Sequence, residues 1–439
     1  MSWRTVRLGE LVDNFSVRAK DVGGADGLDF YGVSNEEGII KTKYAAEDKA
    51  EDYKIIERGC FAYNPYRVNV GSIGLVSDDT RGLISPAYVV FKPKPNAIIP
   101  ELLFKFLKSD EGLRQIKFYA RGTVRQALRF EDLCNIEITI PEFEEQQILY
   151  NKLINSQEAS NILDAELKNQ LELLKKLRQQ LLQDAVQGKL VEQNPKDEPA
   201  RELLKKIKAE KQKLIAEKKL KKEKELPPIK AEEIPFEIPE NWVWCRLGEI
   251  AEIVRGGSPR PAGDPTFYGG DIPFLKVGDL TGYEDIYVRT YTHSIKEAGL
   301  HKTRFVEADT LMLTNSGATL GIPRICTFPT TFNDGIAAFL NLNYINKKYL
   351  YYFLKSKSAW YLKEASRGQG QPNLNTDIIA LTPFPLPPLV EQQRIIEKLE
   401  QAMLHCNDLE ESIQQSESQN EKLLQQVLRE ALRKQPVVE

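Results

Sequence analysis

IPEFEEQQILYNKL (residues 140–153) is followed 246 residues later by LPPLVEQQRIIEKL (residues 386–399). Each stretch goes from a proline through Glu-Gln-Gln into an apolar, helix-like run that ends in Lys-Leu. Proline suits the first position of a helix, and an acidic residue in the first turn faces the positive end of the helix dipole. Both stretches therefore predict a helix start, and their similarity indicates a duplicated unit.

The repeat extends well beyond this motif. Residues 121–153 align without a gap on residues 367–399, and nine of the 33 positions are identical. Two earlier landmarks also return, WRTVRLGEL (3–11) as WVWCRLGEI (242–250) and ELLFKFLKS (101–109) as KYLYYFLKS (348–356). Landmarks that recur in the same order at nearly constant offset mark an internal repeat. The sequence thus predicts two copies of a globular part followed by a helical part.

The globular parts have the pattern of mixed structure. Short apolar runs bounded by Gly, Pro and Asn, such as GLISPAYVVFKP (82–93) and IPFLKVGDL (272–280), are typical of strands. The aromatic and apolar runs at 101–109 and 348–356 favour helices. We therefore expect an α+β fold with two mixed α/β domains in a pseudo-two-fold arrangement.

The helical parts carry apolar seams at helical spacing. In the first copy the seam is Leu167, Leu171, Leu174, Leu181 and Ala185, and Gly188 suits the helix end. In the second copy it is Leu424, Val427, Leu428, Ala431 and Leu432. Each seam needs an apolar partner, and the other helix is the nearest one. We expect the two helices to pair as an antiparallel coiled coil, ~60 Å long at ~1.5 Å per residue.

These patterns divide the chain into five parts. They are a first globular domain (1–141), a first long helix (142–190), a basic helical segment with a proline-containing linker (191–238), a second globular domain (239–387) and a second long helix (388–439). Residues 196–230 hold 12 lysines and one arginine against seven acidic residues. Such a run is most often a solvated helix, although phosphates or an acidic partner could also use it.

Composition limits the possible functions. The formal net charge is −3, so strong binding to nucleic acid through bulk charge is not expected, and local patches would be needed. The five cysteines are widely separated and none of the three histidines stands at metal-ligand spacing from them, which argues against a zinc site or a disulfide framework. No apolar run reaches the roughly 20 residues of a membrane helix, and the start does not resemble a signal peptide. We expect a cytoplasmic protein without a membrane segment.

The arrangement resembles the specificity subunit of type I restriction–modification enzymes. The resemblance rests on the two globular parts each followed by P-x-x-x-EQQ and a long helix, on LRQQLLQDAVQGKL (177–190) with the lysine-rich run after it, on IPENWVWCRLGEIAEIVRGGSP (238–259), and on YGGDIPFLKVGDL (268–280). Together these pieces cover nearly the whole chain. The first domain departs from the pattern, with SVRAKDVGG where the second has IVRGGSPRP.

The resemblance implies a non-catalytic reader of double-stranded DNA. Each globular part would be a target recognition domain for one half of a bipartite, asymmetric site. The helices would hold the domains apart and dock two methyltransferase (modification) subunits, and a motor-nuclease (restriction) subunit would join for cleavage. This chain would bind no cofactor, whereas the partner subunits would use S-adenosylmethionine to methylate adenine N6.

Base edges are read mainly by Arg, Asn, Gln and acidic side chains. Two loop classes carry such residues in both halves. The DNA-binding candidates are Arg121, Thr123, Arg125, Gln126, Asn64 and Arg67 in the first half, and Arg255, Arg260, Asn315, Gln369, Gln371 and Asn373 in the second. The alternative is that these residues only form turns or ion pairs. Gln146, Gln147, Gln392 and Gln393 at the helix starts are candidates for partner-subunit contact, and a solvated face is the alternative there.

No catalytic residues are predicted. An amino-methyltransferase would need an Asn/Asp-Pro-Pro-Tyr/Phe motif, and the nearest match, NPYR (64–67), has one proline too few. No glycine-rich dinucleotide or P-loop motif is present. Two rivals remain open: a tandem-domain coiled-coil adaptor that does not bind DNA, and a self-sufficient methyltransferase.

Overall fold

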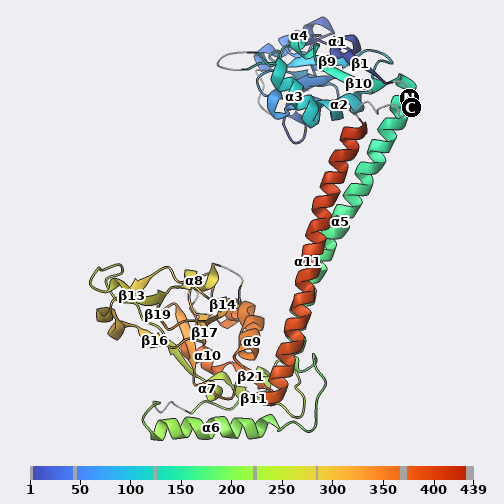
Figure 1. The fold of residues 1–439 in the computed structure, drawn as a ribbon. Helices are drawn as coiled ribbons and strands as arrows, with labels where there is room; N and C mark the ends of the chain where they lie inside the picture. The colour runs from blue at the N-terminus through green and yellow to red at the C-terminus, as the bar shows by residue number, and fades with distance from the viewer. Residues whose placement is uncertain are drawn as a thin grey trace. The chain divides into compact units, whose positions relative to one another are not determined.

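The computed structural model describes residues 3–42, 47–121, 126–220, 225–282, 285–365 and 373–431. It forms two compact units, residues 1–169 with 413–439 and residues 170–412. Each unit contains one globular domain and parts of both long helices. We call the part from β1 to β10 the first domain and the part from β11 to β21 the second domain (Figure 1).

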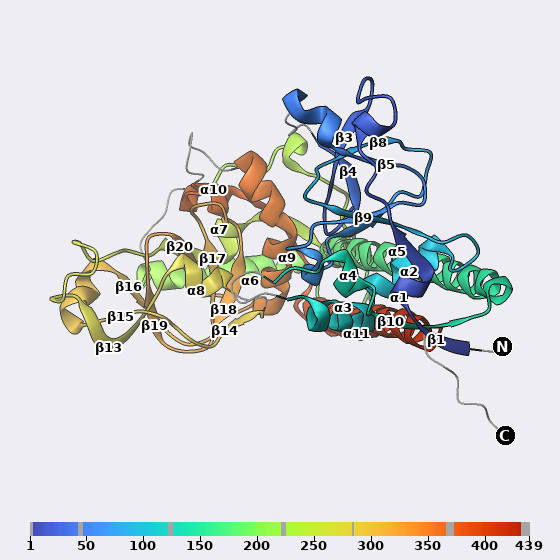
Figure 2. The ribbon, with the colours of Figure 1, turned by 90° about the horizontal axis from the view of Figure 1, so that it is seen from above.

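The first domain contains two four-stranded sheets. The main sheet has the order β2-β9-β6-β7 and the other sheet β4-β3-β8-β5. Their bounds are β2 (Val12–Asn14), β3 (Asp29–Val33), β4 (Ile39–Lys41), β5 (Lys54–Ile56), β6 (Phe61–Tyr63), β7 (Ile73–Leu75), β8 (Gly82–Ile84) and β9 (Val89–Pro93). Figure 2 shows β3, β4, β5 and β8 on one side of β9 and the helices α2 (Pro100–Lys108), α3 (Asp110–Tyr119) and α4 (Phe130–Leu133) on the other. Phe61 and Phe91 stack at 4.8 Å in the core beneath these helices.

The second domain repeats this topology. Its sheets have the orders β12-β20-β17-β18-β14 and β15-β13-β19-β16. Their bounds are β12 (Glu252–Arg255), β13 (Tyr268–Leu275), β14 (Tyr287–Val288), β15 (Ser294–Ile295), β16 (Arg304–Val306), β17 (Thr310–Thr314), β18 (Pro323–Cys326), β19 (Thr330–Phe332) and β20 (Ile336–Leu340). The helices are α8 (Val277–Thr281), α9 (Lys347–Trp360) and α10 (Thr376–Leu381). Strand for strand the order matches the first domain, except that β14 is added beside β18, so the α+β class and the duplication are confirmed.

A two-stranded ribbon closes each domain. In the first domain β1 (Trp3–Arg7) pairs antiparallel with β10 (Glu137–Pro141), and α1 (Leu8–Leu11) follows β1. In the second domain β11 (Val243–Arg246) pairs antiparallel with β21 (Pro383–Leu386), and α7 (Leu247–Ile250) follows β11. The last strand of each ribbon leads into a long helix, α5 (Phe143–Gln187) or α11 (Leu389–Ala431). The beginning and the end of each globular part are thus joined at the base of its long helix.

The two long helices pack against each other in both units, as Figure 1 shows. In the first unit Asn420 donates to the Ser160 carbonyl oxygen over 3.0 Å, and Val427 packs against the cluster of Leu149 and Leu153. Higher residue numbers in one helix therefore face lower numbers in the other. In the second unit Arg178 contacts Asn407 and Glu410 at 2.8 and 2.7 Å. These contacts agree with the predicted antiparallel pairing.

The predicted seam of the first helix is buried at three positions and half-buried at Leu171 and Leu181. Leu167, Leu174 and Ala185 are 5%, 6% and 1% exposed. The helix α5 ends at Gln187, and Gly188 takes a left-handed conformation with φ of 73°. The Lys189 N–H then donates to the Asp184 carbonyl oxygen over 2.9 Å, which completes a Schellman cap. Leu428 and Ala431 of the second seam have no described side chains, and Leu432 lies outside the described residues.

The basic segment forms the helix α6 (Ala200–Ala216), which packs on the second domain (Figure 1). Its apolar face, including Leu203 and Ile207, belongs to the core of that domain. The Lys211 ammonium donates to the Gly248 carbonyl oxygen over 2.7 Å. Lys206 and Lys208 pair with Glu198 and Glu249, both at 2.7 Å. This segment is therefore neither a fully solvated helix nor an open cationic patch, because one face is core and much of its charge is paired.

The cysteines are free thiols in this structure, and four of the five are buried. Burial raises the pKa of Cys60 and of Cys326 to about 11, so both remain protonated near neutral pH. Across the described ranges no group of three His, Cys, Asp or Glu residues could hold a metal ion. Nor does any helix in those ranges combine the length and apolarity needed to span a bilayer.

Candidate nucleic-acid interface

In the first domain the two predicted loop classes meet. One loop follows β6 and contains Asn64 and Arg67, and the other runs from Arg121 to Arg129. The Leu128 N–H donates to the Pro65 carbonyl oxygen over 3.0 Å and ties the loops together. Arg121 and Ala127 exchange two backbone hydrogen bonds of 3.0 and 2.8 Å, which close the second loop at its base. Pro65 and Leu128, which are 63 positions apart in the chain, are thereby brought together.

The second domain makes the same junction. The Leu374 N–H donates to the Asn315 carbonyl oxygen over 2.8 Å, where Asn315 directly follows β17, the counterpart of β6. An isolated bridge joins Ser316 to Asn373 beside it. Leu128 and Leu374 occupy identical positions in the repeat and are both fully buried. A buried leucine in each loop therefore anchors the polar residues around it to the end of a core strand.

The candidates of the first domain differ in their freedom to reach a ligand. Gln126 and Arg67 are exposed. The Arg121 side chain is 76% exposed, and its guanidinium lies 3.0 Å from the Asp132 carboxylate. The Asn64 Oδ1 accepts from the Tyr66 N–H over 3.0 Å, so its side chain stabilises the turn after β6. Among the described candidates of this junction, Arg67, Arg121 and Gln126 are thus the exposed ones.

In the second domain the structure corrects the predicted DNA contact of Asn315. Its side chain is fully buried, and neither its amide nitrogen nor its oxygen has a hydrogen-bond partner. Two backbone hydrogen bonds hold Asn315 in this buried place. Its N–H donates to the Gly335 carbonyl oxygen, and its own carbonyl oxygen accepts from the Leu374 N–H. The prediction that Asn315 touches DNA is therefore wrong for this conformation. Asn373, by contrast, is exposed.

Four predicted contacts fall on residues that the structure does not describe. They are Thr123, Arg125, Gln369 and Gln371. All four belong to the loops anchored by Leu128 and Leu374. Their role stays a prediction.

Sequence reasoning missed part of a basic cluster in the second domain. Arg255 and Arg260 were predicted, and the fold adds Lys302 and Arg304 to them. The Arg304 Nε donates to the Arg255 carbonyl oxygen over 2.9 Å, and the Lys302 ammonium to that of Arg260 over 3.3 Å. All four side chains are exposed, and the described carboxylates pair with none of them. The short pattern KTR at 302–304 was the available signal, but nothing in the sequence placed it beside 255–260.

Gln146 and Gln392, predicted as partner contacts, are fully buried inside their own units. Gln146 Oε1 accepts from the Ile99 N–H over 3.0 Å, and its Nε2 donates to the Pro141 carbonyl oxygen over 3.2 Å. Gln392 Oε1 accepts from the Asn346 N–H over 2.8 Å, and its Nε2 donates to Pro387 over 3.1 Å. Ile99 and Asn346 are the N-cap residues of α2 and α9. The repeated glutamine therefore bonds the start of each long helix to a helix of its domain, and the prediction of a solvent-facing contact is wrong for both.

The neighbouring glutamines are exposed. Gln147 bonds Asn151 and Gln393 bonds Glu397, each at 2.9 Å along its own helix. Glu391, beside them, is 1% exposed and accepts from Gln193. Burial raises the pKa of Glu391, while the hydrogen bond from Gln193 acts in the opposite direction. The helix start thus has a buried side facing the domain and an exposed side on which only Gln147 and Gln393 remain candidates.

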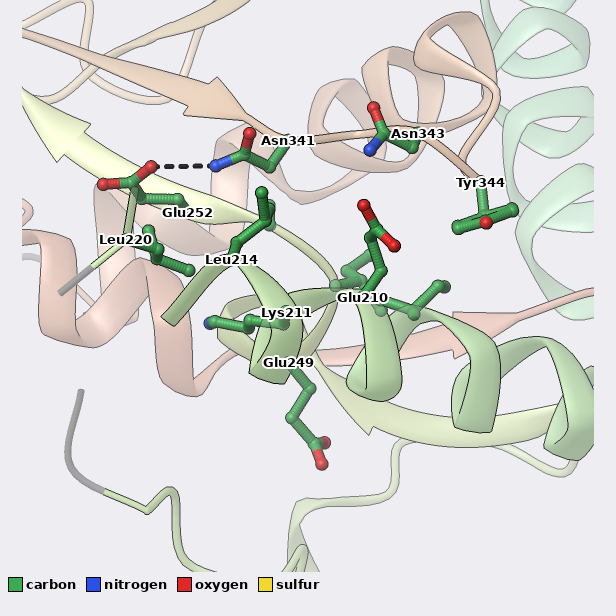
Figure 3. Close-up of a pocket in the computed structure, with 12 residues that line it drawn as sticks. Glu210, Lys211, Leu214, Leu220, Glu249, Glu252, Asn341, Asn343 and Tyr344 are labelled. Carbon is green, nitrogen blue, oxygen red and sulfur yellow. Dashed lines mark hydrogen bonds between the residues drawn. The ribbon is translucent and has the colours of Figure 1, made fainter. Parts of the chain in front are cut away.

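A small pocket lies between α6 and the second domain, and its lining is shown in Figure 3. The Asn341 amide donates to the Glu252 carboxylate over 3.0 Å across its edge. Glu210 and Lys211 enter from α6, and Lys211 is already bonded to Gly248. The polar groups here join α6 to the domain, so we assign no ligand to this pocket.

The same double-domain pattern is found by comparison with known proteins. The family model described as "Type I restriction modification DNA specificity domain" matches residues 2–173 and 239–416, one copy on each half of the repeat. The chain belongs to this family of specificity subunits. The two matched ranges take in both loop junctions and the greater part of both long helices.

Related curated proteins are specificity subunits as well. The chain is 35% identical over 240 residues to the EcoAI specificity subunit of Escherichia coli, covering 53% of this chain and 40% of that protein. It is 32% identical over 256 residues to the EcoEI subunit of the same species, covering 55% and 42%. In these two comparisons the chain spans about two fifths of the relative's length. The HindI subunit of Haemophilus influenzae matches more broadly, at 24% identity over 85% of this chain and 87% of that one.

Solved structures agree in fold. The HsdS subunit from Thermoanaerobacter tengcongensis superposes with a TM-score of 0.59 at 22% identity, covering 98% of this chain and 96% of that one. A chain from a structure of a type I R-M system gives a TM-score of 0.57 at 21% identity, covering 98% and 97%. At these identities the likeness supports the fold and carries no residue-level role.

Proposed function

We propose that this specificity subunit reads one half of a bipartite, asymmetric DNA site with each globular domain. The observation that carries the proposal is the duplicated loop junction, in which a buried leucine ties a polar loop to the end of a core strand in both domains. Exposed Arg, Gln and Asn side chains of these loops suit base edges. The basic cluster of Arg255, Arg260, Lys302 and Arg304 suits backbone phosphates, which position a protein without reading sequence.

In this proposal the long helices dock two methyltransferase subunits, and a motor-nuclease subunit joins for cleavage. The partners bind S-adenosylmethionine and methylate adenine N6, after the adenine is flipped out of the duplex. This chain supplies no catalytic residue and no cofactor site. Gln147 and Gln393, which occupy equivalent exposed positions at the two helix starts, are the contacts we retain for the partners.

The test uses the assembled complex. Purified chain with its modification subunits should methylate adenine at a split sequence and shift a duplex that contains it, and mapping methylated adenines in the source genome should return the same sequence. The net charge of −3 leads us to expect weak, poorly selective binding by the chain alone. A complex that shifts no duplex at any salt concentration would instead favour an adaptor role, and methyl transfer by the chain alone would favour the methyltransferase rival.

A further inference from the structure

The two domains differ at one edge of their main sheets. In the second domain β14 pairs parallel with β18, so that Tyr287 faces Ile325 and Val288 faces Cys326. The Ile325 N–H donates to Ile286 over 3.0 Å and the Thr327 N–H to Val288 over 3.1 Å. In the first domain β7 takes the place of β18 and is the last strand of its sheet, with no other described strand on its outer side.

The difference comes from one connection in the chain. In the first domain residues 34–38 join β3 directly to β4. In the second domain the equivalent connection, residues 276–293, is much longer and holds both α8 and β14. The second copy therefore carries its fifth strand within its own sequence, and the first copy does not.

The backbone N–H groups at the outer edge of β7 are oriented as an added strand would need. The Val76 N–H donates inward to the Cys60 carbonyl oxygen over 2.9 Å. Because successive residues of an extended chain alternate between its two sides, the N–H groups of Leu75, at the end of β7, and of Ser77, two residues beyond it, should point outward. Leu75 faces Phe61 as Ile325 faces Leu311, so Leu75 and Ser77 correspond to Ile325 and Thr327. These are the two positions that bond β14 in the second domain.

A cleft of about 540 Å³ lies beside this edge within the first unit. Leu75 and Ser77 form one wall, Phe104 and Lys105 of α2 another, and Tyr150 of α5 a third. In the second domain the corresponding space is filled, since Ile286 and Tyr287 pack against the core that includes Tyr352, the counterpart of Lys105. The cleft is thus the position that β14 occupies in the other copy.

Charge indicates what suits the cleft. Lys105, Lys108 and one carboxylate, Glu101, line it, and burial lowers the pKa of each lysine. Lys108 donates to the carbonyl oxygens of Asn35 and Gly71. Among the described residues no carboxylate forms an ion pair with either lysine. With two lysines and one glutamate the lining keeps one excess positive charge, which an acidic side chain entering the cleft would balance.

We propose that the edge of β7 and the adjoining cleft bind an extended segment of a partner protein, which adds to the sheet parallel to β7 and carries an acidic side chain beside apolar ones. Main-chain hydrogen bonds to an exposed edge and side-chain pockets next to it are the recognised form of strand addition. The chain's own Asp285-Ile286-Tyr287-Val288 shows the kind of segment that fits, because it fills the equivalent place. The inference does not depend on how the loops read DNA.

The first experiment uses a labelled synthetic peptide, DIYVRT, the sequence of residues 285–290, titrated onto the full chain by fluorescence anisotropy. We expect saturable binding, weakened at least tenfold by Ser77→Pro, which removes an outward N–H, and unchanged within twofold by Ser77→Ala, which keeps it. Lys105→Ala should weaken binding and reduce its salt dependence. Circular dichroism and thermal midpoints establish that the variants fold. Absence of binding, or equal binding to the proline variant, would overturn the proposal.

The second experiment identifies the occupant. A photo-reactive benzoylphenylalanine replaces Phe104 in the full chain, which is then assembled with its purified modification subunits and irradiated. A cross-link to one continuous segment of a partner, competed by DIYVRT, is the expected result. Cross-links only to this chain's own residues would show that the cleft is filled from within and would refute the assignment to a partner.

Discussion

At the residue scale, the repeated glutamine shows how one side chain can connect two parts of a fold. Gln146 and Gln392 each accept from the N-cap N–H of a domain helix and donate to the carbonyl at the end of the preceding strand. Both ends of the amide are used, so the helix start has one orientation relative to the domain. The sequence signalled the importance of the position by repeating it, but periodicity could not tell a buried amide from an exposed one.

Replacing Gln392 by alanine should destabilise the chain by about 1–3 kcal/mol, because the Asn346 N–H and the Pro387 carbonyl would stay buried without a partner. Gln393→Ala is the matched control, since Gln393 is exposed and its two hydrogen bonds, to Glu397 and from the Asn346 amide, are both made at the surface. Urea unfolding followed by circular dichroism measures both. Equal losses for the two variants would contradict the assigned role.

At the element scale, one buried arginine, Arg246, holds the linker that follows α6 against the second domain through Pro227, Pro228 and Glu233. The Arg246 side chain is 3% exposed and donates to the carbonyl oxygens of Pro227, Pro228 and Leu381 and to the Glu233 carboxylate. Its counterpart in the first domain is Arg7, whose side chain is 64% exposed. The Arg7 Nε lies 3.7 Å from the Glu137 carboxylate, which is a weak surface ion pair. The same residue type at the same repeat position is thus buried in one copy and solvated in the other, because only the second copy has a linker to bind.

Arg246→Met should cost about 3–5 kcal/mol, since it leaves a partly buried carboxylate and several carbonyls without their donor. Arg7→Met should change stability by no more than about 0.5 kcal/mol. Urea unfolding gives the energies, and limited trypsin digestion reports release of the linker. Protection of the linker in the Arg246 variant would argue against the arginine as its anchor.

The same contact predicts a pH dependence. The hydrogen bond from Arg246, followed by that from the Lys230 N–H, lowers the pKa of Glu233 from its usual 4.5. A carboxyl with a depressed pKa in the folded state stabilises the protein above its unfolded pKa, and this contribution is lost as the pH falls through the folded value. The stability difference between the native chain and Arg246→Met should therefore shrink below about pH 4.5. A difference that is constant from pH 7 to pH 3 would exclude this source.

Where the two long helices pack together, we expect the buried amide of Asn420 to select their register. Asn420 is 5% exposed and donates to the Ser160 carbonyl and the Asp164 carboxylate, at 3.0 and 2.7 Å. A polar residue in a helical seam selects register at a cost in stability. Asn420→Leu should raise the thermal midpoint while allowing self-association through mispaired helices, seen by analytical ultracentrifugation. Asn161→Leu, on the exposed face, should leave the chain's association state unchanged.

At the scale of the whole molecule, duplication places the two loop junctions that we propose to contact DNA in different compact units. The loop junctions are built from different segments of the chain, each within its own compact unit. Gln126→Ala should relax selectivity in one half-site only, by about 1–3 kcal/mol at the affected base, and Asn373→Ala should act on the other half-site. Methylation of a randomised duplex library by the assembled complex measures both. Equal loss in both half-sites from either variant would disprove modular reading.

The sequence by itself determined the duplication, the α+β class, the two long helices and the end of α5 just before Gly188. These features follow from local periodicity, capping and direct repetition, which are present in the order of residues. Only the tertiary structure decided that Asn315 and Gln392 are buried, that α6 belongs to the core of the second domain, and that Lys302 lies beside Arg260. Such facts depend on which surfaces meet across long stretches of chain, because the same amide or lysine is solvated or buried according to what packs against it.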